Sequence, residues 1–245
     1  MHRTHDPRWG TMRREASLQE ALGRKEAGQL VASIRVGEST GDRGGGGGGS
    51  GAGGASEGNR PEVVALLRAH GVSAEAAPRI AGAGEILRQR TAQSGVEVGA
   101  VLDADTGRPL GPTLEGQADR IHLESQLGLL RPGRRYVQLH THPANTSLSA
   151  QDLALLLAHP EIRTMAAVGR DGAWHVLTKR RGQATASPED GLIAWSDTDA
   201  ALDARYDALI EAGTLLPEEA HRQQLHEVMQ RIAPRLRLRY DRLER

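Results

Sequence analysis

The chain has 245 residues, and its 31 Lys and Arg balance 31 Asp and Glu, so the formal net charge is zero. This balance gives no global indication of a nucleic-acid or membrane partner. Cysteine is absent, which excludes disulfides, zinc fingers and thiol catalysis and limits any zinc site to His and carboxylate ligands. No apolar segment is long enough for a signal-peptide core or a membrane span, so we expect a cytoplasmic protein with no membrane partner.

Residues 1–59 are predicted to form a disordered N-terminal segment that ends in a glycine-rich linker. The segment is polar and mixed in charge, with a short helical pattern at Leu18–Leu30, and Gly44–Gly49 is followed by SGAGGASEGN. This composition is typical of a flexible linker. A phosphate-binding glycine loop would need a preceding apolar strand and a GKS or GKT ending, and the sequence has neither.

Residues 60–196 are predicted to form one α/β domain, which begins with two helices. The run VVALLRAHGV after Pro61 and the run ILRQR from Ile86 both have helical spacing. The periodicity then changes to that of a strand over Val96–Leu102, followed by a turn at Asp105–Gly107 and a returning strand. The sheet is therefore expected to start with a hairpin.

The rest of this domain is predicted to add a strand and a second hairpin, with helices between them. Apolar periodicity and turn residues place these elements in chain order. They are a helix within Ile121–Leu130, a strand at Tyr136–His140, a helix at Ser149–Ala158, and strands at Thr164–Val168 and Trp174–Thr178 around the turn Gly169–Gly172.

Residues 197–245 are predicted to form a helical C-terminal extension that is an appendage to the sheet domain. The segment ALDARYDALIEAG ends at Gly213, and glycine is favoured just beyond a helix end. Pro217, followed by two glutamates, suits the start of a second helix that runs through Ile232. These helices could bind a protein partner.

The last residues, RIAPRLRLRYDRLER, alternate arginine with Leu236, Leu238 and Tyr240. A solvated helix or strand edge is the simplest interpretation. The apolar residues could instead dock this segment onto the sheet domain or onto an acidic partner. Nucleic-acid binding is not favoured, and it would require an affinity that falls steeply with salt.

Two histidines and an aspartate have the spacing of a metal site. His140 and His142 stand at positions i and i+2 of a strand, so they face the same way about 6.6 Å apart along the chain. Pro143 ends the strand because it has no N–H to donate. Asp152 lies in the first turn of a helix that starts at Ser149, where the helix dipole favours a carboxylate. Two His, one carboxylate and one water form the open tetrahedral arrangement of catalytic zinc, so zinc is the expected cofactor.

A simpler interpretation competes with the metal site. The segment SAQD is also an S-x-x-D capping box, in which Ser149 and Asp152 bond each other's backbone and no metal is involved. An HxH pair is weak support by itself. What favours the metal site is the combination of HxHP at a strand end, a short loop, and S-x-x-D at a helix start.

HTHP followed by SAQD resembles the JAMM motif of the JAB/MPN family of zinc metalloproteases, whose usual form is an upstream Glu, HxHP, six loop residues and SxxD. The resemblance implies an α/β fold in which a curved mixed sheet is flanked by helices. It implies that His140, His142 and Asp152 are the zinc ligands and that the Ser149 hydroxyl helps to stabilise the oxyanion.

The upstream glutamate of this family is best matched by Glu97, in the segment EVGAVL on the first predicted strand. The resemblance makes it the general base, with Glu115 and Glu124 as alternatives. The sequence departs from the family pattern at two places. The loop Ala144–Leu148 has five residues where six are usual, and Ala100 stands where the family usually has Gly.

The resemblance implies a zinc-dependent hydrolase that cleaves a peptide or isopeptide bond, often at a ubiquitin-like modifier. The family also includes members without metal or activity, so a catalytically silent scaffold or assembly module of a larger complex or mobile-element particle is the second hypothesis. A barrel-type metallohydrolase is disfavoured, because it needs a longer domain with more ligands. His159 lies at a helix end, and His221 and His226 do not share a helix face.

Overall fold

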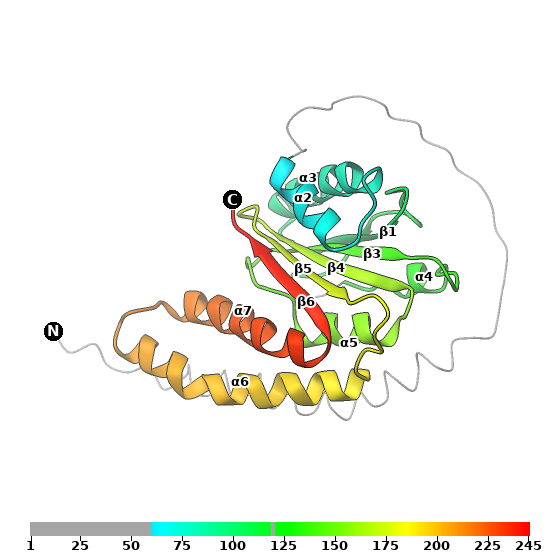
Figure 1. Cartoon of the computed structure of the whole chain (residues 1–245). Coiled ribbons are helices and arrows are strands. Elements are labelled where there is room, and N and C mark those ends of the chain that lie inside the picture. Colours follow the sequence, from blue (N-terminus) through cyan, green and yellow to red (C-terminus); the bar gives the residue numbers. More distant parts are fainter. Residues whose placement is uncertain (1–59, 119–120) are drawn as a thin grey trace. The chain divides into compact units, whose positions relative to one another are not determined.

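A six-stranded mixed sheet lies at the centre of the computed structural model, which describes residues 60–118 and 121–245 (Figure 1). The predicted helix at Leu18–Leu30 and the glycine-rich linker lie outside these residues. The strand order is β2-β1-β3-β4-β5-β6, and β3 and β4 pair in parallel while the other neighbours are antiparallel. The strands are β1 (Val98–Asp103), β2 (Leu114–Glu115), β3 (Tyr136–His142), β4 (Ile162–Gly169), β5 (Trp174–Lys179) and β6 (Leu238–Leu243).

Helices cover both faces of this sheet, as Figure 1 shows. Each face has its own apolar core, one beneath α2 and α3 and the other beneath α5, α6 and α7. The prediction of a mixed α/β sheet flanked by helices is therefore confirmed. No helix within the described ranges is long and apolar enough to cross a membrane. The helices are α2 (Pro61–Ala69), α3 (Ala76–Ser94), α4 (Glu124–Leu127), α5 (Ala150–Ala158), α6 (Pro188–Glu211) and α7 (Pro217–Arg235).

The helix ends follow local sequence signals. Pro61, Pro188 and Pro217 each stand in the first turn of a helix, where the missing N–H costs nothing. Gly95 ends α3 in a left-handed conformation with φ of 74°. Ser149 caps α5 with its side chain.

The first hairpin is less regular than predicted. Asp103 organises its turn, because one carboxylate oxygen accepts from the backbone N–H groups of Asp105 and Thr106. The returning chain then pairs with β1 only at an isolated bridge to Pro109 and at β2. Prolines at 109 and 112 lack the N–H that a longer ladder would need. The predicted helix within Ile121–Leu130 is likewise reduced to the four residues of α4.

The C-terminal segment corrects the prediction of a helical extension. The predicted boundary at residue 197 falls inside α6, and the chain ends in strand β6, which pairs with the whole of β5. Docking of the arginine-rich end onto the sheet, one of the interpretations left open, is what the structure shows. Trp195, Tyr206, Ile232 and Leu238 are buried in the same core as α5. Helices α6 and α7 therefore complete the main fold.

Candidate metal centre

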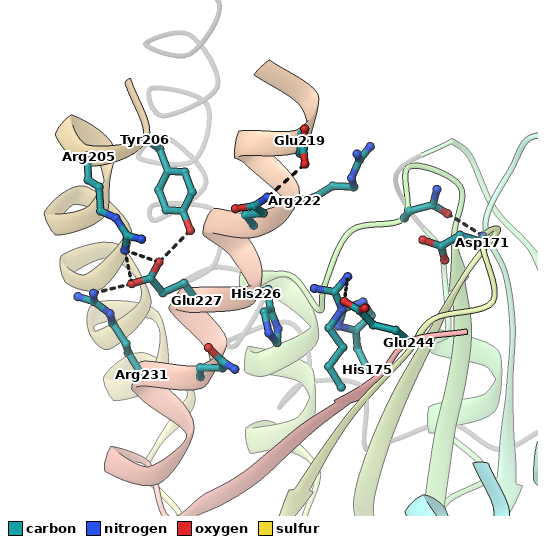
Figure 2. A pocket seen from close by; sticks show the side chains of 14 residues that line it. Asp171, His175, Arg205, Tyr206, Glu219, Arg222, His226, Glu227, Arg231 and Glu244 are labelled. Carbon is teal, nitrogen blue, oxygen red and sulfur yellow. Dashed lines mark hydrogen bonds and ion pairs between the residues drawn. The ribbon is translucent and has the colours of Figure 1, made fainter. Parts of the chain in front are cut away.

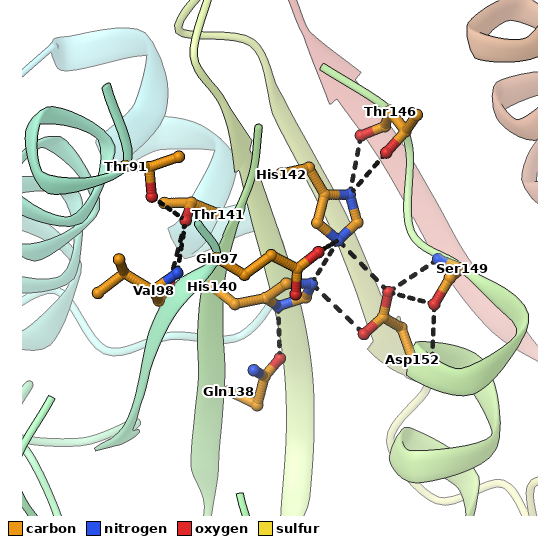
Figure 3. A network of polar contacts seen from close by, with 10 residues as sticks. All are labelled: Thr91, Glu97, Val98, Gln138, His140, Thr141, His142, Thr146, Ser149 and Asp152. Atoms are coloured by element: carbon orange, nitrogen blue, oxygen red, sulfur yellow. Dashed lines mark hydrogen bonds and ion pairs between the residues drawn. The ribbon is translucent and has the colours of Figure 1, made fainter. Parts of the chain in front are cut away.

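The three predicted ligands meet where β3 ends and α5 begins (Figure 3). His140 and His142 are 1% and 5% exposed, and their Nε2 atoms lie 2.8 Å apart. Asp152 approaches from the first turn of α5, with Oδ1 3.3 Å from His140 Nε2 and Oδ2 3.6 Å from His142 Nε2. Among the described residues, this is the group whose donor atoms could hold a metal ion.

Neighbouring groups fix which ring nitrogens face the centre. His142 Nδ1 lies 3.1 Å from the carbonyl oxygen of Thr146, and a carbonyl only accepts, so Nδ1 carries the proton. His140 Nδ1 lies 2.9 Å from Gln138 Oε1, which also accepts. When the rings are neutral, both Nε2 atoms therefore carry lone pairs. Two such lone pairs at 2.8 Å repel each other unless a cation, either a proton or a metal ion, lies between them.

The distances fit a small tetrahedral metal. Metal–ligand bonds of about 2.0–2.1 Å put tetrahedral ligand atoms about 3.3–3.4 Å apart. The contact of His140 Nε2 with Asp152 Oδ1, at 3.3 Å, has this length, while His142 Nε2 lies 3.6 Å from the other carboxylate oxygen, Oδ2. The two Nε2 atoms, at 2.8 Å, would have to separate by about half an ångström. The residues present therefore fit zinc with small adjustments.

Asp152 serves the helix and the candidate centre together. Its Oδ2 accepts from the backbone N–H of Ser149 at 2.8 Å and from the Ser149 hydroxyl at 2.7 Å, which completes a capping box. Oδ1 remains on the side of His140. The two interpretations of SAQD are thus compatible, because the cap orients the carboxylate. The Ser149 hydroxyl proton is directed at Asp152, so it would have to rotate away to stabilise an oxyanion.

The five-residue loop still brings Asp152 to the histidines. Asn145 takes a left-handed conformation with φ of 58°, and its N–H donates to the carbonyl of His142 at 3.1 Å. Its side-chain oxygen accepts from the N–H of Asp171, in the turn between β4 and β5. These two hydrogen bonds hold a tight turn, which lets a loop one residue shorter than the usual pattern bring Asp152 to the histidines.

Glu97 stands beside the three ligands, with Oε1 3.8 Å from His142 Nε2 and the residue 7% exposed. Its backbone pairs with the extension of β2, donating to Gln117 and accepting from Gly116. Position 99, two residues on, faces the same way, and a Cβ there would lie 3.0 Å from the Cβ of His140. The close approach of β1 to the centre therefore requires glycine at 99, and not at Ala100, which is on the other face.

The alternative bases differ from Glu97 in position. Glu115 is exposed on β2 and pairs with Val98, whose side chain lies in the core beneath α2 and α3. Cross-strand partners point to the same face, so Glu115 is directed away from the centre. Glu124 begins α4, but its side chain lies outside the described part of the chain.

The two histidines and Asp152 shift one another's pKa values. Burial, reinforced by the charge of His140, lowers the pKa of His142 to about 4. Burial also opposes charge on His140 and Asp152, but their mutual attraction outweighs it, raising the pKa of His140 and holding that of Asp152 well below its usual range. In the absence of a metal, one proton on His140 therefore supplies the cation that the facing lone pairs require.

A hydroxyl pair on the opposite face locks the strands that carry the site. Thr141, between the two histidines, points toward α3, and its Oγ1 lies 2.5 Å from Thr91 Oγ1. The same oxygen accepts from the N–H of Val98 at 2.9 Å. Because Val98 follows Glu97, this contact fixes the start of β1 relative to β3.

The residues that orient the histidines were not predicted from the sequence. Gln138 lies two positions before His140 on the same strand face, a spacing that could have indicated it. Thr146 acts through its carbonyl, which no side-chain pattern reveals. Ser147, in the same loop, bonds the hydroxyl of Tyr240 on β6, and His226, set aside as a ligand, also contacts that hydroxyl.

A polar pocket of about 750 Å³ adjoins this part of the molecule (Figure 2). It is bounded by α6, α7, β5, β6 and the loop after His142. His175 of β5 lines it and stands in cross-strand register with Ala167, which in turn pairs with His140. The pocket is therefore about two strand spacings, or about 10 Å, from the candidate centre.

The fold and the site together define a mixed α/β protein with a buried His-His-Asp cluster that could hold a metal ion. Comparisons of the chain with protein-family models, with curated proteins and with solved structures gave no match.

Proposed function

We propose that this chain is a zinc-dependent hydrolase that cleaves a peptide or isopeptide bond with a metal-activated water. The observation that carries the proposal is the convergence of His140, His142 and Asp152, in which the Nε2 atoms of two buried imidazoles face each other beside a carboxylate. The order of these residues in HTHP and SAQD, and their resemblance to the JAMM motif, add independent support.

Zinc, when bound, would be held by His140 Nε2, His142 Nε2 and Asp152, and it supplies Lewis acidity that lowers the pKa of a water to about 7 and polarises a carbonyl. Two His and one carboxylate can also hold Fe(II), so the metal must be identified by analysis. Gln138 and Thr146 contribute by holding the imidazole rings in place, and such outer partners commonly tune metal affinity 10–100-fold.

Glu97 is placed to work as the general base. Its carboxylate, beside His142 Nε2, can take the proton of the attacking water and return it to the leaving amine. Ser149 first orients Asp152, and it can stabilise an oxyanion only after its hydroxyl turns from that carboxylate. The substrate would be a peptide or a protein, with a ubiquitin-like modifier as the class that the resemblance implies.

Glu97→Gln tests the proposed chemistry. The variant should keep its zinc, because Glu97 is not a proposed ligand, and should lose hydrolysis by about 10²–10⁴-fold, the usual contribution of general acid–base catalysis. Turnover would be measured on an isopeptide-linked ubiquitin-like conjugate and on an unfolded protein, with bound zinc quantified in parallel.

Glu115→Gln is the matched control, since it makes the same change on the exposed strand β2. It should leave turnover unchanged. Retained turnover in Glu97→Gln would show that another group is the base. A wild-type chain that purifies without chelator and yet holds no metal would instead favour the silent scaffold.

A further inference from the structure

We propose that Tyr240 is a positioning residue for the metal centre, and that its hydroxyl holds the loop between His142 and Ser149 in the conformation that binds metal. This inference rests on the metal centre proposed above. It gives the C-terminal strand a role in a site whose three proposed ligands all lie within residues 140–152.

The Tyr240 hydroxyl lies at the junction of three parts of the fold. It is 2.8 Å from Ser147 Oγ in the loop, 2.8 Å from His175 Nδ1 on β5 and 2.8 Å from His226 Nδ1 on α7. A phenol has one proton to donate and two lone pairs, so three partners use its whole hydrogen-bonding capacity. Burial raises the pKa of Tyr240, which keeps this proton in place.

The Tyr240 hydroxyl contacts Ser147, which is next to Thr146, a residue that orients the ring of His142. Ser147 is 1% exposed, and the preceding Thr146 supplies the carbonyl that accepts from His142 Nδ1. A shift of Ser147 would move this carbonyl and release the ring. The hydroxyl of Tyr240 therefore reaches the ligand through two adjacent loop residues.

The hydroxyl of Tyr240 joins β6 to the second half of the loop, where Leu148 is buried in the core and Thr146 contacts His142. The first half of the loop is fixed by Asn145, which bonds His142 and the turn at Asp171. Asn145 also sits at a φ of 58°, a left-handed conformation that asparagine adopts more readily than most L-residues. Loss of the Tyr240 hydroxyl would leave Ser147 Oγ buried without its partner, which favours rearrangement of the loop.

The test measures affinity of the full-length chain for Zn²⁺ itself, by competition with a chromophoric chelator. Tyr240→Phe should weaken binding by about tenfold, the lower end of the range for outer partners of metal ligands. Ser147→Ala should weaken it by a similar factor. The double variant should lose no more than Tyr240→Phe alone, because both substitutions remove the contact between Tyr240 and Ser147. The absorption spectrum with Co²⁺ should shift in the same variants, since it reports ligand geometry.

Tyr206→Phe is the matched control. Tyr206 is also a buried tyrosine, and its hydroxyl donates to Glu227 at 2.8 Å on the far side of the pocket (Figure 2). The variant loses a comparable hydrogen bond without touching the loop, so its zinc affinity should stay within about twofold of wild type.

Zinc affinity in Tyr240→Phe within about twofold of wild type would overturn the positioning role. Additive losses from Tyr240→Phe and Ser147→Ala would also overturn it, because the hydroxyl would then not act through the loop. If Tyr240→Phe does not fold, the zinc affinity of Ser147→Ala is the test. Wild-type affinity in that variant would contradict the proposal. A wild-type chain that binds no zinc would contradict the proposed function itself, and this outcome is distinct from all of those above.

Discussion

Buried histidines lie on both faces of the sheet, and they differ in how their ring nitrogens are used. On the α2 side, His70 is 2% exposed and donates from Nε2 to Asp241 Oδ2 at 2.8 Å. Its Nδ1 lies 3.0 Å from the hydroxyl oxygen of Thr178. Each ring nitrogen of His70 therefore has its own oxygen partner in the protein.

On the α5 side, His140 and His142 are just as buried, but only their Nδ1 atoms have complementary partners. Their Nε2 atoms face each other and Asp152. Burial of a histidine beside a carboxylate occurs on both faces, so burial alone does not indicate a metal site. What distinguishes the candidate centre is that several lone pairs converge on one point.

The same substitution on the two faces should produce the largest difference between them. His140→Gln removes one of three ligands, so zinc affinity should fall by at least about a hundredfold, more than the loss of an outer partner causes. His70→Gln should bind zinc as wild type does, because the His70 ring contacts Thr178 and Asp241 and not the proposed ligands. Titration with Zn²⁺ would measure both, and equal losses in the two variants would contradict the distinction.

A smaller effect should appear in the pH dependence of stability. Burial, which outweighs the attraction of Asp241, lowers the pKa of His70 from 6.5 to about 4. The unfolded chain therefore takes up a proton near pH 6.5 that folded His70 resists, and stability is lost as pH falls from 6.5 toward 4. At pH 5 this loss amounts to about 2 kcal/mol.

His70→Gln removes the titrating group, so this variant should lose less free energy of unfolding than wild type between pH 7 and pH 5. Urea unfolding at the two pH values measures the difference. Equal losses in the two chains would mean that His70 is not the group that resists protonation.

The sequence predicted the candidate centre well because its parts are local. His140 through Asp152 form one continuous segment, and strand alternation, Pro143 and the helix start at Ser149 together determine which way the side chains point. Glu97 required the family pattern in addition, because it comes from another strand. The contacts of the Asn145 backbone N–H and side-chain oxygen could not be foreseen, since they depend on the fold of the loop.

The C-terminal segment shows where local patterns were insufficient. The alternation of leucine with arginine in LRLRYDRL is compatible with a strand, but only pairing with β5 decides that it is one. The bond between Ser147 and Tyr240 joins residues 93 positions apart, so no spacing rule could connect them. Similarly, prolines at 109 and 112 shortened a hairpin that the turn residues correctly indicated.

The metal content of the purified chain tests the central claim most directly. Wild-type protein prepared without chelator, and then titrated with Zn²⁺, should bind one zinc per chain, as should Glu97→Gln, whereas His140→Gln should not. A wild-type chain that neither retains nor takes up a metal would contradict the account, because a proton on His140 would then be the only cation that the cluster holds.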